Sequence, residues 1–145
     1  MDVNYLTVAV AALAGFFIGF LWYMPPFFGK AWMKAIGISP TPEQMKEKKG
    51  MMWRMGVSLV SVFLVSFVLA YLIEGLYVWK GNLTGSADAM YIAFTTSFLV
   101  WLGFLATSLL DSVLWEKRPW SLWLINAGQW LVRLVVMGVI IGAMM

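Results

Sequence analysis

The sequence contains no cysteine and no histidine among its 145 residues, and only 12% of the residues are charged. Without cysteine there is no disulfide framework, thiol nucleophile or thiolate metal site. Without histidine, a Ser-His-Asp triad and a histidine-based zinc site are also excluded. Because the remaining acid-base groups are a few carboxylates, tyrosines and lysines, we predict a protein that is not an enzyme and that holds no metal or cofactor.

Hydrophobic residues are abundant instead. They make up 62% of the chain, and the mean hydropathy is +0.84. A soluble domain of this length could not cover so much apolar surface, whereas a protein whose solvent is lipid need not. The net charge of +3 could indicate nucleic acid. Because the basic residues flank hydrophobic segments, we attribute them to membrane topology and predict no nucleic-acid partner.

Four segments are long and apolar enough to cross the bilayer as helices, since one span needs about 20 residues. We predict spans at residues 5–24, 52–79, 88–113 and 122–144, with a linker at 25–51. The expected fold is all-α, a single transmembrane domain comprising residues 1–145. The first span follows Asp2 rather than a basic segment, so we interpret it as a retained helix and not a signal peptide.

The basic residues are distributed unequally between the two sides of this bundle. Eight lie in the segments 25–54 and 115–121, which an even number of spans places on one side. The other side carries only Lys80. The positive-inside rule therefore predicts that the basic segments are cytoplasmic and that both termini are outside, in the cell membrane, which we take to be a bacterial inner membrane.

An amphipathic pattern follows the first span. Its apolar face would consist of Phe27, Phe28, Ala31, Trp32, Ala35 and Ile36. Lys30 and Lys34 lie on another face, and Gly37 is a natural stop, so we predict a short helix in the membrane interface. Thr41 and Gln44 form a capping box that predicts a second helix; a solvated basic loop is the alternative. Either form could bind anionic lipid.

Arg133 is the only charge in the fourth span and lies about 16 Å from either end. An unpaired arginine at that depth costs about 2.5 kcal/mol or more. Asn126 and Gln129 share its helical face. We expect a counter-ion, first Asp111, whose side chain should lean towards Arg133 from the antiparallel third span, and otherwise Glu74. These five residues are predicted to form a ligand-binding site or a buried polar network.

Glycines recur every four residues in two spans, at Gly15 and Gly19 and at Gly138 and Gly142. This spacing lets helix backbones approach each other. We favour packing within one chain over a dimer seam, although a bundle of four spans is thin and a homo-oligomer is expected. Trp130 lies three residues before Arg133, and we interpret it as core filling rather than as a ring stacked on the guanidinium.

A characteristic stretch joins the first span to the linker. Together with one glycine of the third span, its pattern positions are Trp22, Tyr23, Pro25, Gly29, Trp32 and Gly103. With Asn4 and Asn126, these residues resemble domain-of-unknown-function family 1761, which comprises small, mostly bacterial membrane proteins. The resemblance covers nearly the whole chain. It implies a four-span membrane protein and assigns no activity.

Two functions are compatible with these features. The first is a homo-oligomeric small-solute transporter or permeation unit with its polar site around Arg133. The span count is similar to that of the small multidrug resistance transporters, although the glutamate of their first span is missing here. The alternative is a structural, partner-binding or lipid-binding membrane protein, in which Arg133 is only a structural ion pair.

Overall fold

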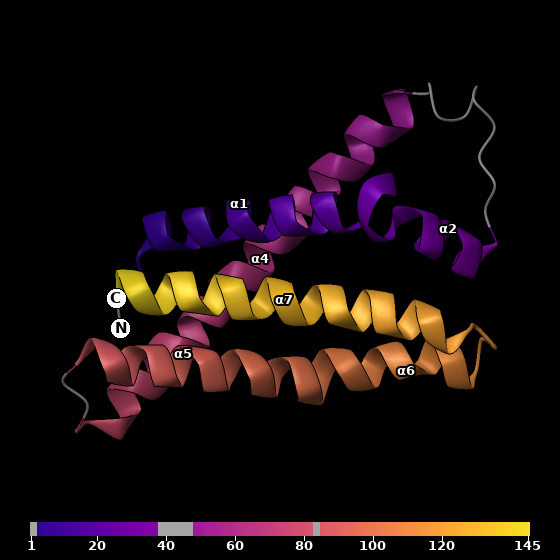
Figure 1. Cartoon of the computed structure of the whole chain (residues 1–145). Helices are drawn as coiled ribbons and strands as arrows, with labels where there is room; N and C mark the ends of the chain where they lie inside the picture. Colours follow the sequence, from indigo (N-terminus) through magenta and orange to yellow (C-terminus); the bar gives the residue numbers. More distant parts are fainter. Residues whose placement is uncertain (1–2, 38–47, 83–84) are drawn as a thin grey trace.

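The computed structural model describes residues 3–37, 48–82 and 85–145. Within these residues, four helical segments are long and apolar enough to cross a membrane, at Tyr5–Trp22, Met52–Lys80, Ser86–Leu114 and Trp120–Met144. They confirm the predicted all-α fold class, and their ends differ from the predicted ones by two residues or fewer. The helices are α1 (Tyr5–Trp22), α4 (Lys48–Lys80), α5 (Ser86–Val100), α6 (Thr107–Leu114) and α7 (Trp120–Met144) (Figure 1).

The ends of α1 follow from local sequence. The side chain of Asn4 accepts a hydrogen bond from the Leu6 amide at 3.0 Å and so caps the first turn. The helix ends at Trp22, and Met24 is already extended, with φ −73° and ψ 147°. Met24 precedes a proline, and that position disfavours helical backbone because the pyrrolidine ring would collide with it.

The linker turns sharply before it becomes helical again. The segment η1 (Pro25–Gly29) contains one non-helical residue, Phe27, with φ −102° and ψ −109°. The Gly29 amide then donates to the Met24 carbonyl at 3.0 Å. Helix α2 (Lys30–Ile36) follows and ends at Gly37, whose left-handed φ of 75° suits glycine. The predicted short linker helix is thus confirmed, whereas the predicted capping box at 41–44 lies outside the described residues.

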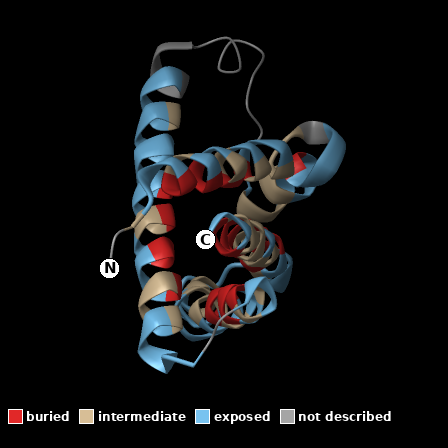
Figure 2. Ribbon diagram, turned by 90° about the vertical axis from the view of Figure 1, so that its left-hand side faces the viewer, coloured by how far each residue is buried: buried red, intermediate tan, exposed pale blue. Residues whose placement is uncertain are grey.

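Helix α7 is central to the bundle. In Figure 1, α1, α7 and the α5–α6 segment run alongside one another, and α4 crosses them obliquely. Helix α7 packs most extensively against α1 and α5, while α4 packs mainly against α1. The Ser66 hydroxyl fixes that last contact by donating to the Val8 carbonyl at 2.8 Å. Buried residues line the inward faces of these helices (Figure 2).

The glycines predicted to let helices approach do so within the chain. A Cβ atom at Gly15 of α1 would lie 2.5 Å from the Met137 sulfur of α7. A Cβ atom at Gly142 of α7 would lie 2.8 Å from the Ala93 side chain of α5. Each glycine seam therefore seats a neighbouring helix of the same molecule, as predicted.

The third span is not a uniform α-helix. A π-helical segment, η2 (Trp101–Ala106), separates α5 from α6. Tryptophan indoles hold both of its ends to α7: Trp101 Nε1 donates to the Ala127 carbonyl at 2.7 Å, and Trp123 Nε1 donates to the Ala106 carbonyl at 3.0 Å. Such π segments alter which side chains face a neighbour and often occur at functional sites.

Candidate functional site

The guanidinium of Arg133 lies inside the bundle, at the contact between α7 and α1. Arg133 is only 7% exposed, although it is the thirteenth residue after the start of α7 at Trp120. Its guanidinium covers Gly19: a Cβ atom there would coincide with Nη2 and lie 2.8 Å from Cζ. The missing side chain of Gly19 therefore makes the space in which this long cation is accommodated.

Two neighbouring residues of α7 complete the walls of this space. The Arg133 Cζ atom lies 4.6 Å from the centroid of the Trp130 ring, which is cation–π geometry. Trp130 also packs against the core, as predicted, so its ring both fills the core and stacks on the guanidinium; the prediction that it would not stack was wrong. Gln129 is 2% exposed, and its Nε2 would lie 3.2 Å from a Cβ atom at Gly19.

No carboxylate neutralises Arg133 in the part of the chain that the structure describes. Its buried Nε atom has no hydrogen-bond partner there. Asp111, the first predicted counter-ion, lies exposed on α6. In the third span, Ser97 contacts α7 at Gly138, and Ala106 contacts it at Trp123. These two contacts lie on either side of Arg133 along α7. Asp111 lies five residues beyond Ala106, more than one helical turn away, so the structure does not bring it to Arg133.

The prediction of Asp111 rested on the direction in which helical side chains lean along the axis. That direction does not determine which neighbouring helix the Arg133 face of α7 is turned to. That face is turned to α1 at Gly19, whereas Gly138 of the same helix is turned to α5 at Ser97. Helix α6 continues the α5 side of the bundle. An acidic residue on α6 therefore lies beside α7 but not beside the guanidinium.

Glu74, the alternative counter-ion, lies half-buried on α4 near the other end of α1. Helices α4 and α1 are antiparallel, with Val62 against Gly15 and Ser66 against Val8. Eight residues beyond Ser66, Glu74 is level with the start of α1, whereas Arg133 lies near its end. The structure therefore does not bring Glu74 to Arg133 either.

Asn126 does join the site, through a residue whose role the sequence did not indicate. The Tyr23 hydroxyl donates to Asn126 Oδ1 at 2.6 Å and connects the end of α1 to α7. Tyr23 lies four residues, about one helical turn, beyond Gly19, the residue that the Arg133 guanidinium covers. The predicted group of five is thus realised as Arg133, Gln129 and Asn126, with Tyr23 in addition.

The pattern residues at the end of α1 build the joint that holds this site. Trp22 Nε1 donates to the Ile125 carbonyl at 3.0 Å, and the Trp22 ring stacks on Phe28 at 4.5 Å. A Cβ atom at Gly128 would lie 3.4 Å from the Trp22 ring. These contacts fix the end of α1 against the first turns of α7, on the N-terminal side of Arg133.

The other pattern residues divide into two groups. Trp32 packs edge-on against Tyr23 at 5.2 Å, and a Cβ atom at Gly29 would collide with the Tyr23 carbonyl. Together with the turn that begins at Pro25, these residues hold Tyr23 in place. Gly103 is apart from them: it lies exposed in η2, where its carbonyl accepts from the Thr107 hydroxyl at 2.8 Å.

The groups that converge on Gly19 define the chemistry that the site can perform. Arg133 offers a cation with an unpartnered Nε donor, and Gln129 offers an amide. The Tyr23 hydroxyl already donates to Asn126. A planar guanidinium without an anionic partner is complementary to a carboxylate or a phosphate. In the described residues, no group of three or more acidic side chains could hold a metal ion.

The sequence contained a signal for the Gly19 contact that helix-face arguments did not use. Gly15 and Gly19 of α1 and Tyr23, directly after it, are spaced by four residues, and in α7 Gln129, Arg133 and Met137 have the same spacing. Two antiparallel helices with such stripes pack closely when the small residues of one helix lie opposite the large residues of the other. This register places Arg133 at Gly19 without any counter-ion.

Four helices that are long and apolar enough to cross a membrane are typical of an integral membrane protein. The family model described as "Protein of unknown function (DUF1761)" matches residues 6–142. The chain therefore belongs to this family, which confirms the resemblance seen in its sequence. No curated protein and no solved structure matches the chain.

Proposed function

We propose that this membrane protein binds a small carboxylate-bearing solute at Arg133 and acts as a transport or permeation unit for it. The observation that carries the proposal is the buried guanidinium whose Nε has no partner among the described residues. An isolated charge of this kind is costly within a membrane. A bound carboxylate would supply the missing negative charge through paired, charge-assisted hydrogen bonds.

The shape of the site favours a carboxylate over a larger polyanion. The space at the guanidinium is limited by the Trp130 ring, the Gln129 amide and the backbone of α1 at Gly19. These walls offer one cation and few further donors. A planar monovalent anion matches that charge, whereas a phosphate group would carry uncompensated charge into the same low-dielectric surroundings.

Lactate is a suitable probe, and two substitutions form a matched pair. We expect lactate to raise the melting temperature of the purified protein above that measured in chloride at equal ionic strength, because a ligand of the folded state stabilises it. Arg133→Gln should abolish this increase. Arg54→Gln, the same change at an exposed position on α4, should retain it. Uptake of labelled lactate into proteoliposomes should follow the same order.

A structural function for Arg133 is the second candidate, favoured by its close fit over Gly19. In that case Arg133→Met, which keeps a long apolar stem, should leave the protein equally or more stable, as replacement of buried charges often does. Lactate should then raise the melting temperature of neither Arg133→Met nor the unaltered protein above the value measured in chloride. A lactate response that persists in Arg133→Gln would contradict the proposed function.

A further inference from the structure

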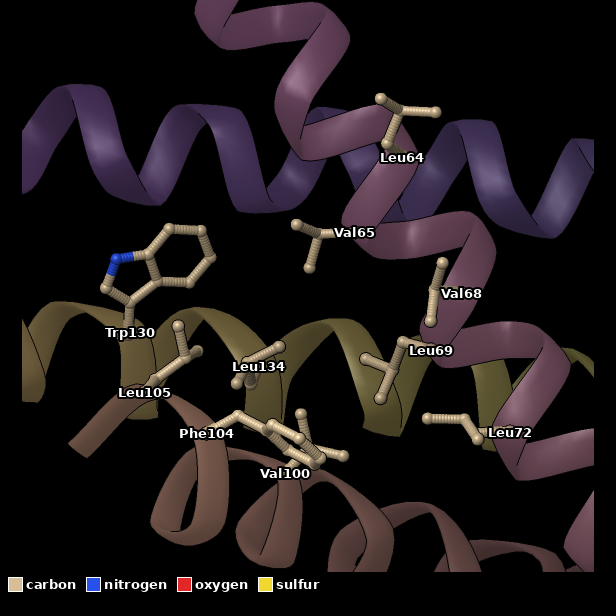
Figure 3. A pocket seen from close by; sticks show the side chains of 10 residues that line it. All are labelled: Leu64, Val65, Val68, Leu69, Leu72, Val100, Phe104, Leu105, Trp130 and Leu134. Carbon is tan, nitrogen blue, oxygen red and sulfur yellow. The ribbon is translucent and has the colours of Figure 1, made fainter. Parts of the chain in front are cut away.

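A long apolar groove runs along α4, and Trp130, whose ring also lies against Arg133, lines one end of it. Its inner part is a hollow of about 320 Å³. Figure 3 shows side chains from α4, the α5–η2 segment and α7 converging on it, with Leu64 and Leu72 at its two ends on α4 and Trp130 and Leu134 contributed by α7. Aliphatic and aromatic side chains line this part throughout, and none of them carries a charge.

A second hollow of about 340 Å³ continues the first towards the C-terminal end of α4. Both are lined by Leu72, Val100 and Phe104, so the two hollows adjoin and are together called the groove. From Leu64 to Lys80 the groove follows sixteen residues of α4, which is about 24 Å at helical rise. That length is comparable with most of the hydrocarbon thickness of a bilayer, about 30 Å.

The polarity of the groove changes along its length. Thr95, Thr96 and Lys80 line the second hollow, and each supplies a polar group that the first hollow lacks. The Lys80 ammonium lies 5.8 Å from the centroid of the Tyr91 ring, which lines the same hollow. The ring thus keeps the cation at the mouth. No acidic side chain lines either hollow.

We propose that this groove binds a single-chain anionic amphiphile, a fatty acid, with its carboxylate at Lys80 and its chain extended along α4 towards Trp130. The apolar inner part suits the chain, and the cation at one end suits the headgroup. The hollows follow each other along one helix, so they accept one chain rather than two side by side. This site differs from the proposed lactate site in its cation and its ligand, and the two sites have Trp130 in common.

Tryptophan quenching by brominated fatty acids tests the proposal, because a bromine atom quenches an indole that it touches. The contribution of Trp130 is the difference between the unaltered protein and Trp130→Phe. A fatty acid brominated at the far end of its chain should quench Trp130. One brominated beside the carboxylate should not, because its bromine would lie near Lys80. Equal Trp130 quenching by the two positional isomers would overturn the proposed orientation.

Substitutions along the groove separate specific binding from ordinary lipid contact. Val100→Phe should fill the segment shared by both hollows and remove the quenching of Trp130, and Leu72→Phe, at a position 39% exposed, provides a second variant if the first does not fold. Val78→Phe is the control, since Val78 is 65% exposed and lines neither hollow. Quenching that persists in both filled variants would overturn the proposal.

The charge at the mouth gives a third measurement. Lys80→Gln should raise the concentration of fatty acid needed for half-maximal quenching about two- to fivefold, as expected for one exposed ion pair. The methyl ester of the same brominated fatty acid should bind to the unaltered protein more weakly than the acid does. It should bind equally well to the unaltered protein and to Lys80→Gln. An ester that quenches as well as the acid would overturn the role of Lys80. Val100→Phe should leave the response to lactate unchanged, so the two sites can fail independently.

Discussion

The guanidinium of Arg133 occupies the space that a side chain would need at Gly19. This relationship joins the polar residues of α7 to the otherwise apolar helix α1. It also means that the position of the cation depends on a residue that contributes no polar group. A methyl group at Gly19 is therefore the smallest change that should disturb the site.

We predict that Gly19→Ala displaces the guanidinium and lowers the free energy of unfolding by about 1–3 kcal/mol, the usual cost of overpacking. The response to lactate should be lost at the same time. Both can be measured on the purified protein, by denaturant titration in mixed micelles and by thermal shift. Gly56→Ala is the control, because a Cβ atom at Gly56 meets nothing within 4 Å. If Gly19→Ala changed the stability and the lactate response no more than Gly56→Ala does, the close contact between Gly19 and the Arg133 guanidinium would be contradicted.

The hydrogen bond between Tyr23 and Asn126 should couple the end of α1 to α7. At 2.6 Å and partly buried, it should contribute about 1 kcal/mol to stability. A double-mutant cycle of Tyr23→Phe and Asn126→Ala should give a coupling energy of that size. Additive effects of the two substitutions would show that the bond contributes nothing measurable.

The spans were predictable because hydrophobic length is a property of the chain itself. The end of α1 before Met24 and the end of α2 at Gly37 also followed from local rules. A residue before proline is disfavoured in helical backbone, and glycine readily adopts the left-handed conformation that closes a helix. The π segment η2 was not predictable in this way. Its register depends on tertiary bonds such as that from Trp101 to Ala127, which involve residues far apart in sequence.

The candidate site was predictable only in part. The stripe of Asn126, Gln129 and Arg133 on one face of α7 follows from helical periodicity, and all three residues do face the protein. The choice of Asp111 as counter-ion required the rotation of α7 relative to α6, which periodicity within one helix does not define. The pairing of Arg133 with Gly19 depends on the fit of two whole helices.

The contact of α5 with α7 at Gly138 gives a prediction with an internal rescue. A Cβ atom at Gly138 would collide with the Ser97 hydroxyl and lie 3.1 Å from the Ala93 carbonyl. Gly138→Ala should therefore destabilise the protein by about 1–3 kcal/mol. Adding Ser97→Gly removes the colliding side chain and should restore part of that loss. A double variant that is less stable than the sum of the single effects would contradict this contact.

The absence of cysteine allows the predicted orientation to be tested by labelling single introduced thiols. Asn82→Cys and Ser121→Cys change exposed residues at opposite ends of the third span. A membrane-impermeant maleimide should label Asn82→Cys in intact cells and Ser121→Cys only after permeabilisation. The physical reason is that eight basic residues flank the spans on the Ser121 side and Lys80 alone flanks them on the other. The reverse labelling pattern would place both termini in the cytoplasm and would move the Lys80 end of the groove to the inner leaflet.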